Sequence, residues 1–315
     1  MGKFTLYWAV DDRGDFPGTQ GLSASINLDG LPIQRDRVEL GYEWASMYPK
    51  EGLHVAQDPK WMQSYVDNIG TWLDIWCGKD FDGYFALDFE SLSLYWEDNS
   101  DAVKTAWHDW NMQNNPYFRR LKPSGYEKFY RDSWNVAMKK FYSATIAECH
   151  KQRPAAKFCV WGVPYISAWD IYNPTKVYSW DCRWYRLKWL WEISDFFMPS
   201  PYTPRIVVDN PVNWWEGTYN FVKDYQYAVL RQASRTQIFG GSKDKEIISC
   251  INLRNVPAVM KDSGQEWVDS NSLNLMIQIP KTLGYNVAIW DALESKEKRD
   301  EMQNFIDTNL KTLTF

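Results

Sequence analysis

Apolar and polar positions along this chain follow two periods, one typical of strands and one typical of helices. Short apolar runs alternate with longer segments in which apolar residues recur at helical spacing. The runs predict strands at 4–8, 84–87, 157–163, 196–198, 246–252 and 286–290, and the longer segments predict helices at 58–76, 126–152, 181–193, 219–234, 272–283 and 295–310. Strands that alternate with helices predict a parallel sheet. We therefore expect an α/β fold, a distorted (β/α) TIM-like barrel of roughly seven or eight strands.

Two segments lack a clear period, and we predict both to be irregular loops. Residues 13–31 are rich in Gly, Asp and Ser, and residues 93–124 are polar and aromatic. In a barrel, such loops build the face that carries the active site. Neither segment resembles a linker, so we expect one catalytic barrel domain over residues 1–315.

Composition narrows the classes of function. Aromatic residues make up 17% of the 315 residues, which excludes intrinsic disorder. A net charge of −5 argues against a nucleic-acid-binding protein that relies on a broad basic face. No apolar run reaches the length of about 18–20 residues that a membrane span needs. We expect neither nucleic acid nor membrane as a partner.

The cysteines and the N-terminal residues bear on metal binding and export. The five cysteines are scattered without a C-x-x-C motif, which predicts no zinc site and at least one unpaired thiol. The start, MGKFTLYWAV, lacks the apolar segment of a signal peptide, and no Asn-x-Ser/Thr sequon occurs. These features weaken the expectation of a secreted animal protein, and they leave the localisation open.

The most informative segment is DGYFALDFESLSLYWEDN, residues 82–99. Asp88 and Glu90 lie two positions apart at the end of a predicted strand, so we expect both on one side of it. Carboxylates at the C-terminal strand ends of a barrel line the catalytic mouth. Two carboxyl groups this close cannot both ionise easily, so the pKa of one should rise, and that group can protonate a glycosidic oxygen. A solvated pair without a catalytic role is the alternative, because D-x-E is a common pattern.

Further motifs occur in a fixed order over residues 4–291. They read FTLYW, ALDFES, ATIAECHKQRPAAKFCVWGVPY, LKWLWEISDFFMPSPY and NVAIWDAL. Their order and approximate spacing resemble the hyaluronidases of glycoside hydrolase family 56. In that family the corresponding motifs read I-D-F-E or I-D-W-E, then R-P-A, W-L-[WF]-E with P-S-x-Y, and I-W-G.

The resemblance implies a role for each matching residue. Glu90 would be the proton donor and then the base, and Asp88 would orient the acetamido group of the substrate. Tyr202 would hydrogen-bond that group or the nearby sugar, and Trp290 would form part of the pocket wall. The substrate's own N-acetyl oxygen would act as the nucleophile, with retention of configuration. This mechanism does not need a second carboxylate on the far side of the bond.

Aromatic residues near predicted strand ends are candidates for sugar binding. A ring packs against the C–H face of a pyranose with little loss of entropy. Besides Trp290, we assign Trp161, Tyr165 and Tyr7 to substrate binding. The loops offer three further candidates, which are Trp169, Trp214 and Trp215. We expect most of the other tryptophans to pack in the core.

The chain departs from the family pattern in several places. The family's Trp-Arg-Pro after D-F-E is replaced by residues that begin with Ser91 and Leu92, so an arginine expected near a uronic acid is missing. Trp161 stands where the family has an active-site tyrosine, and Ile166 stands near a family cysteine. The basic cluster 119–122 follows the catalytic strand and offers a groove for an anionic polymer, although a solvated face is the commoner role of such residues.

Together these features predict an endo-glycosidase that hydrolyses β-linked glycans containing N-acetylhexosamine, of the hyaluronan or chondroitin type. Two alternatives stay open. One is a catalytically impaired glycan-binding homologue, and the other is a barrel glycosidase for another N-acetylated polysaccharide. We expect no metal and no cofactor, a polysaccharide as partner and a monomer. An extracellular location is implied by the family alone.

Overall fold

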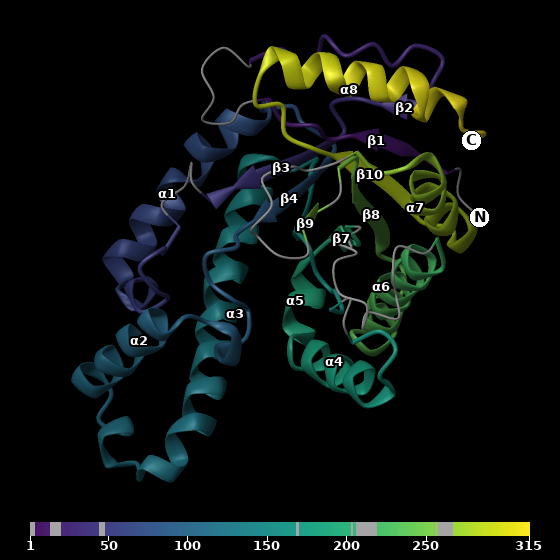
Figure 1. Cartoon of the computed structure of the whole chain (residues 1–315). Coiled ribbons are helices and arrows are strands. Elements are labelled where there is room, and N and C mark those ends of the chain that lie inside the picture. The colour runs from purple at the N-terminus through teal and green to yellow at the C-terminus, as the bar shows by residue number, and fades with distance from the viewer. Residues whose placement is uncertain are drawn as a thin grey trace. The chain divides into compact units, whose positions relative to one another are not determined.

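The computed structural model describes residues 4–12, 20–43, 48–167, 170–202, 204–205, 219–254, 256–257 and 267–315. The chain divides into two compact units whose segments alternate along the sequence. Unit 1 comprises Met1–Leu40, Trp161–Arg186 and Phe196–Phe315, and unit 2 comprises Gly41–Val160 and Leu187–Asp195. Figure 1 labels their helices and strands. The expectation of a single catalytic domain over residues 1–315 stays a prediction.

Unit 1 is built on a five-stranded sheet in the order β2-β1-β10-β8-β6. Its strands are β1 (Leu6–Trp8), β2 (Ile33–Gln34), β6 (Phe196–Phe197), β8 (Glu246–Asn252) and β10 (Asn286–Trp290). Every pairing is parallel, and β10 pairs with β8 from Asn286 opposite Ile248 to Trp290 opposite Asn252. Apolar runs buried on both faces are typical of such sheets, and Ile247 to Asn252 are all buried. A separate parallel pair is formed by β7 (Pro204–Arg205) and β9 (Val256–Pro257).

The helices of unit 1 follow the predicted pattern. They are α4 (Pro174–Arg186), α6 (Tyr219–Phe239), α7 (Ser270–Leu283) and α8 (Lys296–Thr308), with a short 3-10 helix, η6 (Leu310–Thr312), after α8. Figure 1 shows α6 and α7 packed side by side next to β8. The carboxylate of Asp269 caps α7 by accepting from the backbone N–H of Ser272 at 3.0 Å. Gly284 ends α7 with a φ of 80°, a left-handed conformation that glycine adopts without strain.

Unit 2 contains a three-stranded sheet in the order β3-β4-β5, and the pairing of β4 with β5 is parallel. The strands are β3 (Val38–Tyr42), which begins in unit 1, β4 (Tyr84–Asp88) and β5 (Lys157–Val160). Gly41 permits the close approach of β3 to β4, because a Cβ at this position would lie 2.5 Å from the ring of Phe85.

In its described residues, unit 2 also contains three longer helices and one short helix, together with short 3-10 helices. The helices are α1 (Pro59–Trp76), α2 (Asp101–Asn114), α3 (Tyr126–Gln152) and α5 (Lys188–Ile193). The 3-10 helices of this unit include η2 (Val55–Gln57), η3 (Trp96–Asp98), η4 (Phe118–Arg120) and η5 (Pro123–Gly125). Asp58 caps α1, and α3 spans the predicted range. Its apolar residues at helical spacing begin with the half-buried Tyr130 and continue with five buried residues, Trp134, Met138, Phe141, Thr145 and Cys149.

The structure corrects three sequence predictions. Residues 93–124 are not an irregular loop, because they contain α2, η3, η4 and most of η5. Helix α2 buries one narrow stripe, Val103, Trp107 and Asn111, so its apolar period is hidden among polar positions. The single helix predicted over 181–193 is two helices, interrupted at Leu187. Strand β3 was not predicted, because a glutamate and a glycine interrupt its apolar positions.

The described parts of the chain contain neither a cross-link nor a membrane span. All five cysteines lie in these parts and none forms a disulfide, and Cys182 is the exposed one among them. No described helix combines the length and the apolar character needed to cross a bilayer. The α/β class with parallel strands, predicted from the sequence, is confirmed.

Candidate active site

Strand β4 carries Asp88 to its C-terminal end. Phe85, Ala86 and Leu87 are fully buried, and this burial fixes the strand in the sheet. The strand ends at Asp88, so Glu90 lies in the loop that follows and not on the strand as predicted. The Asp88 side chain is buried at 5% exposure, whereas Glu90 reaches solvent.

Phe89, between the two carboxyl groups, anchors this strand end in an aromatic cluster. Its ring centroid lies 4.6 Å from that of Tyr48, 5.6 Å from Trp72 and 6.2 Å from Tyr142. Tilted aromatic pairs of this kind add to the stabilisation that comes from burial. The anchored Phe89 therefore restrains the backbone on both sides, which carries Asp88 and Glu90.

A third carboxylate, Glu43, is tied to the same loop. It follows β3, and its Oε2 accepts a hydrogen bond from the backbone N–H of Ser91 at 3.0 Å. The Ser91 hydroxyl donates to the other oxygen of Glu43. Sequence reasoning missed Glu43 because β3 was not predicted. The available signal was a carboxylate directly after a strand, the same signal that identified Asp88.

Burial and like charges raise the pKa values of both predicted catalytic carboxyl groups. Burial, Glu90 and Glu43, in that order, raise the pKa of Asp88 to about 8. Burial and then Glu43 raise the pKa of Glu90 as well. Within the described residues, Oδ1 of Asp88 is buried and has no hydrogen-bond partner. A carboxyl pair in this setting retains a proton near neutral pH, which is a requirement for a general acid.

The Asp88→Asn variant is expected to change how stability depends on pH. In the unfolded chain Asp88 releases its proton at about pH 4, whereas the folded protein holds it to about pH 8. The free energy of unfolding of the parent therefore falls as pH rises through this window. Each tenfold change in proton affinity corresponds to roughly 1.4 kcal/mol, so the total fall is at most about 5 kcal/mol. Asparagine does not titrate, so the variant should gain stability relative to the parent from pH 5 to 8. Thermal unfolding followed across this range measures the difference.

Asp98→Asn makes the same chemical change at an exposed position and serves as the control. Its curve of melting temperature against pH should run parallel to that of the parent. If the Asp88→Asn curve is also parallel to the parent, Asp88 does not carry a raised pKa.

Unit 1 brings three of the predicted aromatic residues together. The rings of Tyr202 and Trp290 stack with centroids 5.8 Å apart and an interplanar angle of 11°. Trp161 lies 5.8 Å from Tyr202 at an angle of 48°. All three side chains are half-buried, so part of each ring is accessible. Within the described residues, the buried Nε1 of Trp161 lacks a hydrogen-bond acceptor, so it can donate to a ligand oxygen.

The other two predicted substrate-binding residues of unit 1 have different surroundings. Tyr7 lies in the middle of β1 and is 5% exposed. Tyr165 is half-buried, and its ring packs against Trp180 at 4.9 Å and Trp184 at 5.3 Å. Their roles in substrate binding stay predictions. Trp169, Trp214 and Trp215 lie outside the described residues.

A buried ion pair stabilises the backbone next to Trp290. The guanidinium Nε of Arg254 donates to the carboxylate of Asp291 at 2.9 and 3.1 Å, and the guanidinium also donates to the carbonyl of Ala292 at 2.9 Å. Both side chains are buried, at 7% and 1% exposure. The pair connects the segment after β8 with the segment after β10, and it was not predicted from the sequence. Its position suits a role in holding Trp290 in place.

The described residues contain no group of three or more His, Cys, Asp or Glu side chains suited to a metal ion.

Comparison with known proteins finds no matching family model and no matching curated sequence. The similarity appears in solved structures. The chain superposes on a crystal structure of bee venom hyaluronidase with a TM-score of 0.74 and 15% identity, over 98% of both chains. It also superposes on bee venom hyaluronidase in complex with a hyaluronic acid tetramer, with a TM-score of 0.69 and 16% identity over 98% of both chains.

The superposition spans 98% of the chain, and it applies to the fold, since the identity is low. The resemblance to family 56 hyaluronidases is thus confirmed at the level of the fold, and this chain has the TIM-like α/β fold of bee venom hyaluronidase.

Proposed function

We propose that this protein is an endo-glycosidase that cuts β-linked glycans next to N-acetylhexosamine, with Glu90 as the acid and base. One observation carries the proposal. A carboxyl pair at the end of β4 retains a proton near neutral pH, on a fold shared with hyaluronidase. A purely structural role for the pair would leave unexplained why a third carboxylate is held beside it.

The proposed reaction has two steps. Glu90 donates its proton to the glycosidic oxygen while the acetamido oxygen of the substrate attacks the anomeric carbon and the glycosidic bond breaks. Ionised Glu90 then takes a proton from water, whose oxygen attacks the same carbon and opens the cyclic intermediate. Two displacements at one carbon retain its configuration.

Asp88 would stabilise the acetamido group during the first step. The acetamido nitrogen gains positive charge as the ring closes, and a nearby positive charge favours the ionised form of a carboxyl group. The interaction therefore strengthens toward the transition state, which is the condition for catalysis. The unpartnered Oδ1 of Asp88 supports this role, since it is free to accept the acetamido N–H.

The aromatic cluster of Tyr202, Trp290 and Trp161 would bind sugar rings. Its stacked and accessible rings support the proposal, and the Tyr202 hydroxyl adds a polar group. The Tyr202 oxygen lies 3.6 Å from the sulfur of Cys250, a weak hydrogen-bond partner that a sugar hydroxyl or acetamido group can outcompete.

Hyaluronan is the first substrate to test, followed by chondroitin. Incubating the protein with each polymer, and with chitin oligosaccharides, should release new reducing ends from hyaluronan or chondroitin. NMR of the first products should show the β-anomer. Cleavage of chitin alone would mean that the substrate is another N-acetylated polysaccharide. Binding without any product would support the glycan-binding homologue and contradict the proposed reaction.

The Glu43→Gln variant is expected to shift the pH dependence of this activity. Glu90 must be protonated to act as the acid, so activity falls as pH rises through its pKa. The charge of Glu43 raises that pKa, and glutamine removes the charge. The alkaline side of the kcat/KM profile should therefore move to lower pH, and a series of rate measurements across pH detects the shift.

Glu51→Gln removes one carboxylate from an exposed position and controls for a general change in net charge. An identical shift in both variants would mean that the overall charge, and not the contact with the catalytic loop, governs the profile.

A further inference from the structure

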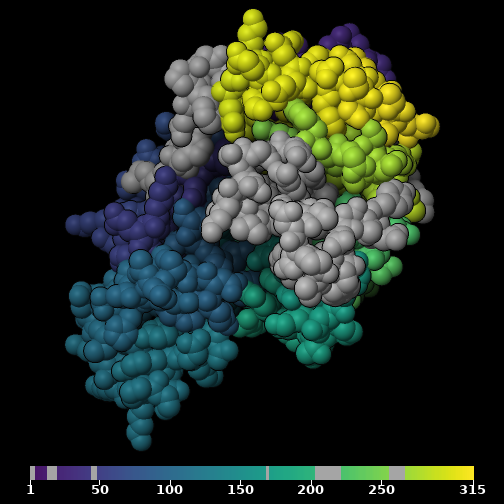
Figure 2. All heavy atoms as spheres, viewed as in Figure 1, coloured from purple at the N-terminus to yellow at the C-terminus, as the bar shows by residue number. Residues whose placement is uncertain are grey.

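Unit 2 has a hairpin formed by η3, α2, η4, η5 and the first part of α3. Together with Gln57 of η2, this hairpin lines a cavity that the proposed reaction does not use. Its volume is about 650 Å³, within the range of about 300–1,000 Å³ that small-ligand sites occupy. Figure 1 shows that α2 and the start of α3 extend away from β4, so the cavity is separate from the carboxyl pair. The hairpin, blue to teal in Figure 2, presents its surface to solvent.

Aromatic side chains form the walls of this cavity. Trp107 and Trp110 stack with ring centroids 5.7 Å apart and an interplanar angle of 19°. Phe129 is half-buried, and Tyr117 is 65% exposed although it lines the cavity. Aromatic rings that remain accessible beside a cavity offer an apolar face to a ligand.

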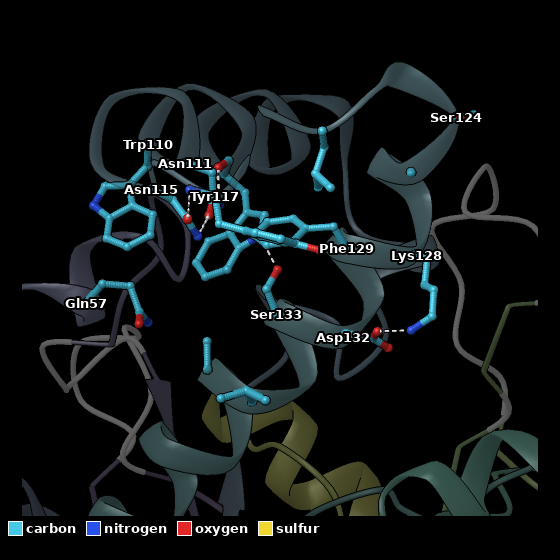
Figure 3. A pocket seen from close by; sticks show the side chains of 15 residues that line it. Gln57, Trp110, Asn111, Asn115, Tyr117, Ser124, Lys128, Phe129, Asp132 and Ser133 are labelled. Atoms are coloured by element: carbon cyan, nitrogen blue, oxygen red, sulfur yellow. Dashed lines mark hydrogen bonds and ion pairs between the residues drawn. The ribbon is translucent and has the colours of Figure 1, made fainter. Parts of the chain in front are cut away.

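Polar groups complete the lining and indicate the class of ligand. Figure 3 shows the indole of Trp110 and the amide of Gln57 on one side of the cavity and the ion pair of Lys128 with Asp132 on the other. Asn115 and Ser133 also line it. The one cation and one anion of the lining compensate each other, so the cavity suits a neutral ligand with hydroxyl and amide groups. Aromatic faces next to such polar groups match a sugar ring, whose C–H face is apolar and whose edge is polar.

A cluster of positive charge lies on the same hairpin. Arg119 and Arg120 belong to η4, between the lining residues Tyr117 and Leu121, and Lys122 follows. All three cations are exposed, and none forms an ion pair within the described residues. No acidic residue occurs from 115 to 126, so this part of an acidic protein is locally basic.

We propose that the hairpin is an auxiliary, non-catalytic binding site for a linear anionic polysaccharide. The cavity takes one N-acetylhexosamine unit, and Arg119, Arg120 and Lys122 contact the uronate groups of the neighbouring units. The choice of ligand rests on the proposed function, while the site itself rests on the cavity and the cations. Such a site raises the affinity for long chains by a second point of attachment.

Binding of hyaluronan to the whole 315-residue chain that carries Glu90→Gln tests the proposal without cleavage. In this background, Arg119→Gln/Arg120→Gln is expected to weaken binding about tenfold. A single exposed charge contact contributes little, and the loss of two such contacts together has an effect of this size. Trp110→Ala should also weaken it about tenfold, and Trp110→Phe should restore most of the loss. Isothermal titration at low and high salt measures the affinities, and the effect of the arginine pair should shrink at high salt.

Lys139→Gln/Lys140→Gln removes two exposed cations of α3 outside the cavity lining and is the matched control. Its affinity should equal that of the background protein. The proposal would be overturned if the control lost as much affinity for hyaluronan as the arginine variant, or if single-stranded DNA bound as tightly as hyaluronan. Either result would mean that the hairpin attracts polyanions without specificity. Should Trp110→Ala fail to fold, the exposed Tyr117→Ala replaces it.

The same measurements separate this proposal from the proposed function. If the parent cuts no polymer but binds hyaluronan through the hairpin, the enzymatic function fails and the auxiliary site stands. If the parent cuts hyaluronan and the hairpin variants bind like the background, the auxiliary site alone fails. The absence of any polysaccharide binding contradicts both.

Discussion

Glu90→Gln is expected to lower kcat on hyaluronan by about a thousandfold or more, because the variant can neither protonate the leaving oxygen nor activate water. The substitution preserves shape and removes the proton that the surrounding carboxylates retain on this group. Because Glu90 lies in a loop and reaches solvent, the fold should tolerate the change. Affinity for the polymer should change far less than kcat, since the amide keeps the polar contacts. Initial rates over a range of substrate concentrations measure both quantities.

Glu97→Gln is the matched control, since it makes the same change at an exposed position seven residues further along the chain. It should retain the rate of the parent. A Glu90→Gln protein that still cuts hyaluronan at the parental rate would exclude Glu90 as the acid. A search among the remaining carboxyl groups would then begin with Asp88 and Glu43.

Asp291→Ala is expected to cause the largest loss of stability. It leaves the guanidinium of Arg254 buried without its counter-ion, and breaking such a pair typically costs about 3–5 kcal/mol. The hydrogen bonds from Arg254 to Asp291 and Ala292 hold the segment that directly follows Trp290, the last residue of β10, whose ring stacks on Tyr202. Urea denaturation should therefore show a lower midpoint with an unchanged slope. Activity should fall as well, at temperatures where the variant is still folded.

The double variant Arg254→Met/Asp291→Leu distinguishes two causes of destabilisation. One is a buried Arg254 charge without its counter-ion, and the other is the loss of the ion pair itself. Replacing both partners by apolar residues of similar size is often close to neutral. The double variant should therefore recover most of the stability lost in Asp291→Ala. If it recovers stability but not activity, the ion pair acts by positioning Trp290. If Asp291→Ala is as stable as the parent, the pair does not hold this segment.

The helices and strands that could be predicted from the sequence are those with an undisturbed period. Helix α3 and strands β8 and β10 have the predicted bounds, because long apolar stripes and short buried runs are local signals. Helix α2 and strand β3 were missed for one reason. Each contributes only a few buried side chains, and polar residues interrupt the apolar pattern.

The residues of the candidate site also fall into two groups, those that a local sequence signal identifies and those that only long-range contacts bring together. Asp88 and Glu90 could be identified because a carboxylate directly after a buried run is visible in the sequence. Glu43 could not, since its proximity to Glu90 depends on the pairing of two strands more than 40 residues apart and on the hydrogen bonds from Ser91. The pairing of Arg254 with Asp291 is likewise a long-range contact, between residues 37 positions apart.

Local sequence patterns therefore suffice to predict the alternation of strands and helices, the parallel α/β class and the carboxyl pair at the end of β4. These properties follow from local periodicity and from residue types at strand ends. Three further features depend on tertiary contacts. They are the third carboxylate that raises the pKa values of that pair, the cluster of Tyr202, Trp290 and Trp161, and the cavity lined by the hairpin of α2 and α3. Distances between residues remote in sequence set the pKa values, the aromatic contacts and the cavity, and such distances exist only once the strands have paired and the helices have packed.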